Sequence, residues 1–298
     1  MAITSDFVYH CPNDLKGALS LLAKEKNALP LAGGTDLICN LKEERAICKN
    51  LIDLKNIKGL NSIALAKDKK SIFLGALVTF SDLINSELIN KRLPLVMEMS
   101  KTVASVAIRN RATLVGNICS AVPSMDSGTI LAVYDAKVEL RSLKGGSRVV
   151  PISKWFVAPK KTALKKGELV LGVTIPLPSN EQAGCYIKLG RYQGEDLAQA
   201  SISVLALANK QYRIAFGAVA PIPVRAGKIE KLLNGHEINT ALLKQAYDLV
   251  EQEISPITDI RATAKYRMHM SKVMLGRALI IADERLKGHG PHYGITHL

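Results

Sequence analysis

Apolar side chains at helical spacing define the first element of the chain. They form one stripe between residues 12 and 26, after the cap-like Asn13-Asp14 pair: Leu15, Ala18, Leu19, Leu22 and Ala23. A short apolar run at residues 29–31 leads into Gly33-Gly34-Thr35-Asp36, and a second apolar run at residues 50–54 follows a polar helix. The pattern predicts a small strand, helix and strand unit.

Helix and strand signals continue to alternate in the middle of the chain. Residues 62–66 and 71–75 flank a polar stretch and predict a hairpin, after which Ser81-Asp82 can cap a short helix. Further segments of the alternating pattern follow in order: residues 95–102, 108–121, 129–134, 137–141 and 168–175. Pro176-Leu177-Pro178 interrupts both helix and sheet, so we place a domain boundary there.

The last part of the chain has a different order of elements. Three segments are typical of antiparallel strands: residues 185–189, 201–208 and 213–220. Three helical segments follow them: residues 226–233, 240–254 and 262–286. This order predicts a small sheet with helices packed on it. The tail from residue 288 carries His289, His292 and His297, for which we expect a frayed or interface-docked segment rather than a metal site.

Composition and charge narrow the possible classes of protein. With 298 residues and 48% hydrophobic content, the chain can form large packed cores. The 40 Lys and Arg residues against 26 Asp and Glu residues give a net charge of +14, which indicates an acidic partner. Phosphates, nucleic acid and an acidic subunit all fit, although only 5% of residues are aromatic, which weakens the case for base stacking.

The cysteines and the apolar runs indicate where in the cell the protein is expected. The five cysteines are scattered without a CxxC pair, so neither a disulfide framework nor a zinc or iron–sulfur site is predicted. No apolar run approaches the about 20 residues that span a bilayer, and the N-terminal residues do not form a secretory signal. We therefore expect a soluble, unprocessed, cytoplasmic protein that inserts into no membrane.

Two glycine-containing loops carry the candidate chemistry. The first is Leu31-Ala32-Gly33-Gly34-Thr35-Asp36, and the second runs from Arg111 to Ala121 and includes Thr113, Gly116 and Asn117. Glycine lets backbone N–H groups approach a phosphate, although a glycine pair after a strand is also typical of a simple turn. Together the loops could hold a pyrophosphate. The GxGxxG and GxxxxGK[ST] motifs are absent, which disfavours a Rossmann site and a P-loop.

Four stretches give the sequence a family resemblance. They are Ala32-Gly33-Gly34-Thr35-Asp36, the block from Arg109 to Asp126, Thr162-Ala163-Leu164 with Glu168-Leu169-Val170, and Gly217-Ala218-Val219-Ala220 with Pro223-Val224-Arg225-Ala226. The chain resembles the medium, FAD-binding subunit of the molybdenum hydroxylases, the family that also forms the middle domain of xanthine dehydrogenase.

This resemblance implies an α+β fold with a two-subdomain FAD-binding domain of the PCMH/vanillyl-alcohol-oxidase type. That domain would comprise residues 1–176, with subdomains of about 1–56 and 57–176. Residues 177–298 would form the C-terminal molybdenum-hydroxylase flavoprotein domain.

The resemblance also assigns roles to residues of both loops. In the family the loops hold the FAD diphosphate, and this role falls here to Ala32, Gly33, Gly34, Thr35, Thr113, Gly116 and Asn117, with Leu31 and Asp36 beside them. Asp126 matches an acidic residue that accepts hydrogen bonds from the ribose or adenine, although it could equally be a helix cap. Val115 replaces a family glycine, so the backbone there must avoid positive φ or the loop is reshaped.

The flavin side of the implied site involves other residues. Lys188 matches a family lysine near the flavin, where a cation would stabilise charge on the reduced ring, but it could also be a solvated strand lysine. Leu169 or Val170 would pack on the ring or in the core, and Asp196 could orient Lys188 or Arg191. No histidine lies in these segments, so FAD is expected to bind non-covalently.

The resemblance implies an electron-transfer subunit without catalytic or metal-ligating residues of its own. FAD would take electrons from [2Fe-2S] clusters on a partner subunit and pass them to NAD(P)+ or another acceptor. The molybdenum cofactor, on a further subunit, would hydroxylate an N-heterocycle such as nicotinate or a purine. The alternatives are a self-sufficient flavin oxidase on the same fold and a basic nucleic-acid-binding protein.

Overall fold

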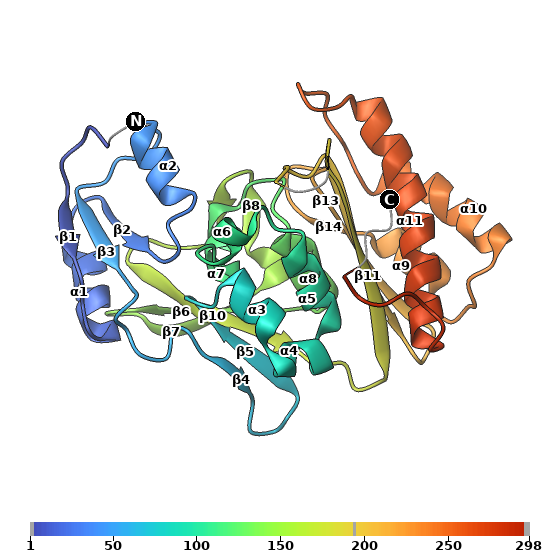
Figure 1. Cartoon of the computed structure of the whole chain (residues 1–298), viewed down its shortest axis with the longest axis horizontal. Coiled ribbons are helices and arrows are strands. Elements are labelled where there is room, and N and C mark those ends of the chain that lie inside the picture. The colour runs from blue at the N-terminus through green and yellow to red at the C-terminus, as the bar shows by residue number, and fades with distance from the viewer. Residues whose placement is uncertain (1–2, 193–194, 295–298) are drawn as a thin grey trace.

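A computed structural model describes residues 3–192 and 195–294 of the chain (Figure 1). Its N-terminal lobe is a parallel three-stranded sheet in the order β1-β3-β2. The elements of this lobe are β1 (Val8–His10), α1 (Leu15–Lys24), β2 (Ala28–Leu31), α2 (Leu37–Lys42) and β3 (Asn50–Asp53). The predicted strand, helix and strand unit is confirmed, and Asp14 caps α1 by accepting a hydrogen bond from Gly17 N.

The central part is an antiparallel five-stranded sheet in the order β4-β5-β10-β6-β7. Its strands are β4 (Ile63–Leu65), β5 (Ser71–Gly75), β6 (Lys137–Ser142), β7 (Gly146–Pro151) and β10 (Glu168–Pro176). The predicted hairpin of β4 and β5 is confirmed. A short 3₁₀ turn (Ile152–Lys154) and the two-stranded β8 (Phe156–Ala158) and β9 (Lys161–Thr162) lie between β7 and β10.

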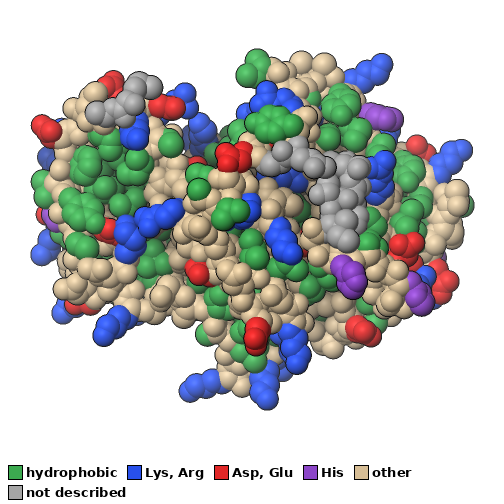
Figure 2. All heavy atoms as spheres, viewed as in Figure 1, with side chains coloured by type: hydrophobic (Ala, Val, Ile, Leu, Met, Phe, Trp, Pro, Cys, Tyr) green, Lys and Arg blue, Asp and Glu red, His purple; other side chains and the backbone are tan. Residues whose placement is uncertain are grey.

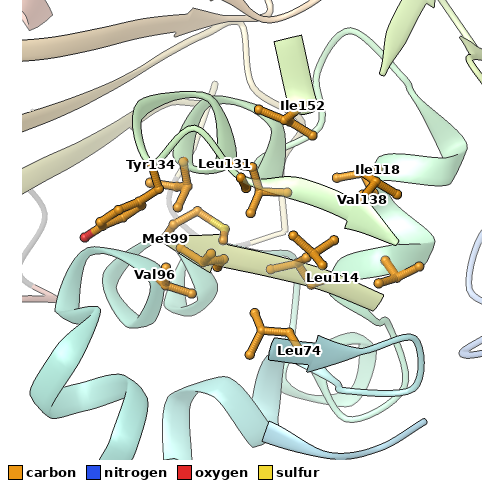
Figure 3. Close-up of a cluster of buried hydrophobic side chains, with 14 of the residues drawn as sticks. Leu74, Val96, Met99, Leu114, Ile118, Leu131, Tyr134, Val138 and Ile152 are labelled. Carbon is orange, nitrogen blue, oxygen red and sulfur yellow. The ribbon is translucent and has the colours of Figure 1, made fainter. Parts of the chain in front are cut away.

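Short helices cover one face of this sheet: α3 (Phe80–Asn85), α4 (Glu87–Arg92), α5 (Pro94–Lys101), α6 (Val106–Arg109), α7 (Leu114–Ser120) and α8 (Ser127–Val133). Helix α3 begins one residue before the predicted cap, because Thr79 and Asp82 form a capping box there. Figure 3 shows the core between the sheet and the helices, where Leu74 and Val138 of the strands meet Met99, Leu114 and Leu131 of the helices.

The last sheet is antiparallel, in the order β11-β12-β13-β14. Its elements are β11 (Gln182–Leu189), β12 (Ala200–Leu207), β13 (Gln211–Gly217) and β14 (Val224–Arg225), followed by α9 (Gly227–Leu233), α10 (Thr240–Leu249), a 3₁₀ turn (Val250–Gln252) and α11 (Ala264–Leu286). Helix α11 packs on β11 and β12 from one side, while α5 and α8 pack from the other (Figure 1). Every residue of β12 is therefore buried.

The end of β13 and the tail differ from the sequence expectation. Strand β13 ends at Gly217 rather than continuing to residue 220, because Ala218 adopts a positive φ of 62° that ends the extended backbone. The tail was expected to fray or to dock at an interface, but its described part lies on the chain itself. The Tyr293 hydroxyl accepts a hydrogen bond from Gly184 N, and Gly294 N donates to Glu98. His297 lies outside the described residues.

Together the parallel sheet, the antiparallel sheets and their helices confirm the α+β class. None of the described helices is both long enough and apolar enough to cross a membrane. Within residues 3–192 and 195–294 there is also no group of His, Cys, Asp and Glu side chains arranged to hold a metal ion.

Candidate functional site

A cleft of about 430 Å³ separates the N-terminal lobe from the rest of the molecule. Figure 2 shows the surface hollowed between these two parts. The loop after β2 forms one wall, the region from α6 to the start of α8 forms the other, and the end of β11 closes the cleft with residues 195–197. Its walls thus come from the N-terminal lobe, from the helices and connections of the central part, and from β11 with the residues after it.

Most of the predicted cofactor residues line this cleft: Ala32, Gly33, Gly34, Thr35, Asp36, Thr113, Gly116, Asn117, Asp126 and Lys188. Leu31 and Leu169 do not. Leu31 is buried against Leu41 and Leu51 in the N-terminal lobe, and Leu169 is buried in the cluster beneath α1. Val170, the alternative to Leu169, is also in the core. At both β10 positions the structure shows plain core packing.

The two glycine loops meet through a backbone contact at Gly33. A Cβ at this position would lie 2.0 Å from the backbone carbonyl oxygen of Arg111, so a side chain there would displace one loop from the other. Gly34 follows with a φ of +79°, which glycine adopts without strain. Gly33 thus allows the close approach of the two loops, and Gly34 allows the turn that follows it.

The second predicted loop, Arg111 to Ala121, is mostly helix, because α7 spans Leu114–Ser120 and includes Gly116 and Asn117. Thr113 caps α7, and its hydroxyl accepts a hydrogen bond from Gly116 N at 2.9 Å. Val115 lies within the helix, away from positive φ, and its buried side chain joins the core. The departure from the family glycine is thus accommodated by helical backbone, and Gly116 is the residue that lines the cleft.

Asn117 presents its amide nitrogen as a donor. Its Oδ1 accepts hydrogen bonds from the backbone N–H of Ser127 at 3.2 Å and from the Ser127 hydroxyl at 2.6 Å. A backbone N–H can only donate, so the bonded atom is the oxygen and the NH₂ group is left over. Within the described part of the chain this NH₂ group makes no hydrogen bond, and the residue lines the cleft.

Asp126 and Lys188 form a buried ion pair at the inner end of the cleft. Lys188 Nζ lies 3.1 Å from Asp126 Oδ1 and donates to the Thr102 carbonyl oxygen at 3.0 Å, while Tyr186 donates its hydroxyl proton to Asp126 at 2.9 Å. Burial raises the pKa of the Asp126 carboxyl, and the charge of Lys188 and the Tyr186 hydrogen bond oppose that rise. Asp126 precedes α8 but makes no side-chain capping bond, and Lys188 is only 9% exposed, so the cap and solvated-lysine alternatives are both wrong.

Asp196 orients Arg191 rather than Lys188. Its carboxylate accepts hydrogen bonds from the Arg191 backbone N–H and from the guanidinium Nη2 at 3.3 Å. Burial raises the pKa of Asp196, but these bonds outweigh it and hold the pKa below its usual range. Both Asp196 and its neighbour Leu197 line the mouth of the cleft.

Sequence reasoning missed the apolar side of the cleft. Phe80 of α3, Val103 of the connection between α5 and α6, and Ile108 of α6 line it, and none of them belongs to a motif that predicts a ligand contact. Tyr186 was missed as well, although its position two residues before Lys188 on one strand places both side chains on the same face. Cys119 also lines the cleft, and burial raises the pKa of its thiol to about 12, so it is protonated at neutral pH.

The chain matches two protein-family models and is similar in sequence to known proteins. Residues 5–178 match the family model of the FAD binding domain in molybdopterin dehydrogenase, and residues 186–282 match that of the CO dehydrogenase flavoprotein C-terminal domain. The chain is 31% identical to the xanthine dehydrogenase FAD-binding subunit of Escherichia coli O157:H7, over 94% of this chain and 98% of that protein. It is 32% identical to the carbon monoxide dehydrogenase medium chain of Afipia carboxidovorans, over 96% and 99%.

The same similarity is seen in solved structures. A chain of CO dehydrogenase from Oligotropha carboxidovorans superimposes with a TM-score of 0.90 and 32% identity, covering 95% of this chain and 100% of that one. A chain of quinoline 2-oxidoreductase from Pseudomonas putida 86 superimposes with a TM-score of 0.89 and 25% identity, covering 96% and 99%. The similarity therefore extends over the cleft and the last sheet together.

Proposed function

This chain belongs to the family of FAD-binding domains of molybdopterin dehydrogenases, an oxidoreductase family, and on that premise we propose that it is the FAD-carrying electron-transfer subunit of a multi-subunit molybdenum hydroxylase. In this proposal, residues 1–176 form the FAD-binding domain and residues 177–298 the C-terminal flavoprotein domain. The observation that carries the proposal is the meeting of the two glycine loops in a cleft, within a chain of this family.

The cleft fits the diphosphate of FAD by the chemistry of its donors. At Gly33 the close backbone contact with Arg111 brings the two glycine loops together, and the Thr35 hydroxyl and the Asn117 NH₂ group make no hydrogen bond within the described residues. Loops of this kind hold phosphate through hydrogen-bond donors at close approach. We assign the diphosphate to Ala32–Thr35 together with Thr113, Gly116 and Asn117. Asp36, at the start of α2, is an acidic residue beside this group.

The flavin ring is assigned to the inner end of the cleft, at Lys188. Bound there, FAD would supply a carrier that stores two electrons and exchanges them singly. Lys188 would offer a cation to the ring, and Asp126 would hold the ammonium group in place while Tyr186 fixes the carboxylate. Because Asp126 is already used in this way, its role toward ribose or adenine gives way to a positioning role in the proposal.

The partners and the substrate follow from the names of the relatives. Medium chains and subunits are parts of larger enzymes, so we propose that iron–sulfur and molybdenum subunits complete this complex and that NAD(P)+ or another acceptor receives the electrons. Relatives that are named for N-heterocycles include the xanthine and caffeine dehydrogenases, nicotine 6-hydroxylase and quinoline 2-oxidoreductase. These names support an N-heterocycle, such as nicotinate or a purine, as the hydroxylated substrate.

The test uses the complex purified through this chain. Acid release should give FAD from this chain, and molybdenum and iron should remain with the other subunits. Nicotinate, xanthine, CO and glyceraldehyde are then added one by one without oxygen, and the loss of visible flavin absorbance identifies the substrate class. A chain that purifies without flavin and takes up no added FAD would overturn the proposal. Salt-sensitive DNA binding by such a chain would favour the nucleic-acid alternative.

A further inference from the structure

The connection between α5 and α6 forms a wall of the cleft next to Lys188. Val103 and Ala104 of this connection line the cleft, and Val103 is buried. The carbonyl oxygen of Thr102, the residue before them, accepts a hydrogen bond from Lys188 Nζ at 3.0 Å. We call residues 102–104 the inner wall. The position of the Lys188 ammonium group therefore depends on where the inner wall lies.

The inner wall contains a strained residue. Ala104 has a φ of 38°, in the left-handed region where the Cβ of a residue other than glycine meets steric repulsion. The backbone on either side is ordinary, since Thr102 is helical and Ser105 is extended. A single strained residue of this kind persists only where the surrounding contacts hold it.

Arg109, the last residue of α6, supplies these contacts. Its Nη1 atom donates to the carbonyl oxygen of Val103 at 2.8 Å and to that of Ala104 at 2.7 Å. Together with the bond from Lys188 to Thr102, three successive carbonyl oxygens are bound by cationic side chains. Hydrogen bonds from a charged donor are stronger than those from a neutral one. The two cations thus hold the inner wall at its first and last residues.

The guanidinium of Arg109 has no other partner in the part of the chain that the structure describes. It makes no ion pair with a carboxylate there, and its remaining nitrogen atoms make no hydrogen bond. Arg109 is also not part of the cleft lining, although its neighbour Ile108 is. An arginine that binds only the backbone of one wall acts on the conformation of that wall.

We propose that Arg109 is a positioning residue for the flavin end of the cleft. It holds Ala104 in the left-handed conformation, and this keeps the Thr102 carbonyl oxygen in the place where Lys188 Nζ binds it. The ammonium group is then fixed between two partners, Thr102 and Asp126. The inference rests on the proposed function, because it gives Arg109 a role toward bound FAD.

This role concerns reduced FAD more than oxidised FAD. The reduced ring carries negative charge that a fixed cation stabilises, whereas the oxidised ring is neutral. Without Arg109 the inner wall relaxes out of the strained conformation and Lys188 loses its bond to Thr102, so that Asp126 alone positions the ammonium group. Reduced FAD should therefore lose more affinity than oxidised FAD.

The test compares the two redox forms of FAD on the full-length chain. Dissociation constants are measured for the unchanged chain, Arg109→Met and Arg109→Lys. We expect Arg109→Met to weaken the binding of reduced FAD at least about tenfold and that of oxidised FAD about threefold or less. The reduction potential of the bound flavin should fall accordingly, because the ratio of the two affinities sets it. Arg109→Lys keeps a charged donor and should lie between the two.

A variant of Ala104 tests the strain itself. Ala104→Gly adopts a φ of 38° without steric cost. In the Arg109→Met background, Ala104→Gly should therefore recover the affinity for reduced FAD by at least about threefold. Urea unfolding measures the same coupling without FAD. There the double variant should lose less stability than the sum of the losses in the two single variants.

Arg92→Met is the matched control. Arg92 is exposed at the end of α4, and its side chain makes no hydrogen bond or ion pair within residues 3–192 and 195–294. The substitution removes the same charge as Arg109→Met and should change both dissociation constants less than about twofold.

Two results would overturn the role of Arg109. In the first, Arg109→Met binds both forms of FAD as Arg92→Met does. In the second, it loses equal affinity for both forms and Ala104→Gly recovers none of it, which would make Arg109 a support of the fold alone. If the unchanged chain binds no FAD, the proposed function fails instead, and the urea measurements still show whether Arg109 holds Ala104. The two failures are therefore distinguishable.

Discussion

A side chain at position 33 is excluded by a backbone atom, which cannot move aside as the end of a flexible side chain could. The Cβ of Gly33→Ala would lie 2.0 Å from the Arg111 carbonyl oxygen, so the two loops must separate. We expect this variant to lose most of its FAD and about 2 kcal/mol or more of its free energy of unfolding. The FAD-to-protein ratio and urea unfolding measure both effects. Gly227→Ala is the control, because a Cβ there meets nothing within 4 Å; equal losses in both variants would contradict the contact.

Lys188 and Asp126 depend on each other because both are buried. Lys188→Met leaves the Asp126 carboxylate without its cation, and breaking a buried ion pair in this way costs about 3–5 kcal/mol. Lys188→Met/Asp126→Asn removes both charges, so we expect it to regain most of that stability while it still lacks the cation at the cleft. Urea unfolding gives the free energies. A double variant as unstable as the single one would show that the charge of Asp126 is not what Lys188 compensates.

The roles predicted for the residues of the two glycine loops came from the family resemblance, because a glycine pair after a strand is by itself typical of a simple turn. Sequence reasoning did not decide between the roles open to Leu169, Asp126 and Lys188. The burial of Leu169 depends on α1, which is distant in the sequence, and the pairing of Asp126 with Lys188 depends on the end of β11 lying close to the residue before α8. Such contacts between distant elements have no local signal.

The strands of the central sheet are joined at one edge by an ion pair. Arg148 of β7 donates to both Glu168 oxygens of β10, at 2.9 and 2.6 Å. Burial raises the pKa of Glu168, but hydrogen bonds from Arg148 and from Lys165 N outweigh it and lower the pKa. A lowered pKa means that the pair stabilises the fold above the unfolded-state value of about 4.3 and that this contribution is lost as the pH falls through the folded-state value.

Glu168→Gln should therefore lower the free energy of unfolding by about 1–2 kcal/mol at neutral pH and by less in acid. Urea unfolding across the acid range measures the difference. Glu237→Gln is the control, since the Glu237 side chain is 75% exposed in its pair with Lys210 and should contribute little at any pH. A loss for Glu168→Gln that stays constant into acid would attribute the effect to packing rather than to charge.

Elements with a regular repeat of apolar and polar residues could be predicted from the sequence. Strands that form only because a neighbouring strand pairs with them could not. Helix α1 and the hairpin of β4 and β5 have strong local patterns and a cap or turn at each end. Strand β1 has two exposed residues out of three, and β7 lies at a sheet edge, so neither shows a regular alternation of apolar and polar residues. Both become strands because a neighbouring strand supplies hydrogen bonds.

One buried ionic cluster connects the central helices, the last sheet and the tail. Glu98 of α5 pairs with Arg285 of α11 at 2.8 Å and accepts hydrogen bonds from Tyr186 N and Gly294 N, and the Tyr293 ring lies 4.0 Å from the Arg285 guanidinium. Tyr186 and Lys188 share one face of β11. The cluster thus fixes the strand that carries the lysine of the cleft.

Breaking this cluster should separate the release of FAD from the unfolding of the last sheet. In the unchanged protein, release of FAD and unfolding of the last sheet are expected in one urea transition, because Glu98 and Arg285 hold β11 against α5. Arg285→Met leaves Glu98 buried without its cation, which costs about 3–5 kcal/mol, so flavin fluorescence should rise at lower urea than the change in circular dichroism.

Tyr293→Phe tests the same cluster more gently. It keeps the ring on Arg285 and removes only the hydroxyl that accepts a hydrogen bond from Gly184 N, so we expect a loss of about 1 kcal/mol and a single transition. Tyr266→Phe, on an exposed face of α11, is its control. If FAD release and unfolding still coincide in Arg285→Met, the cleft is held by the central helices alone and the cluster only adds stability to the whole molecule.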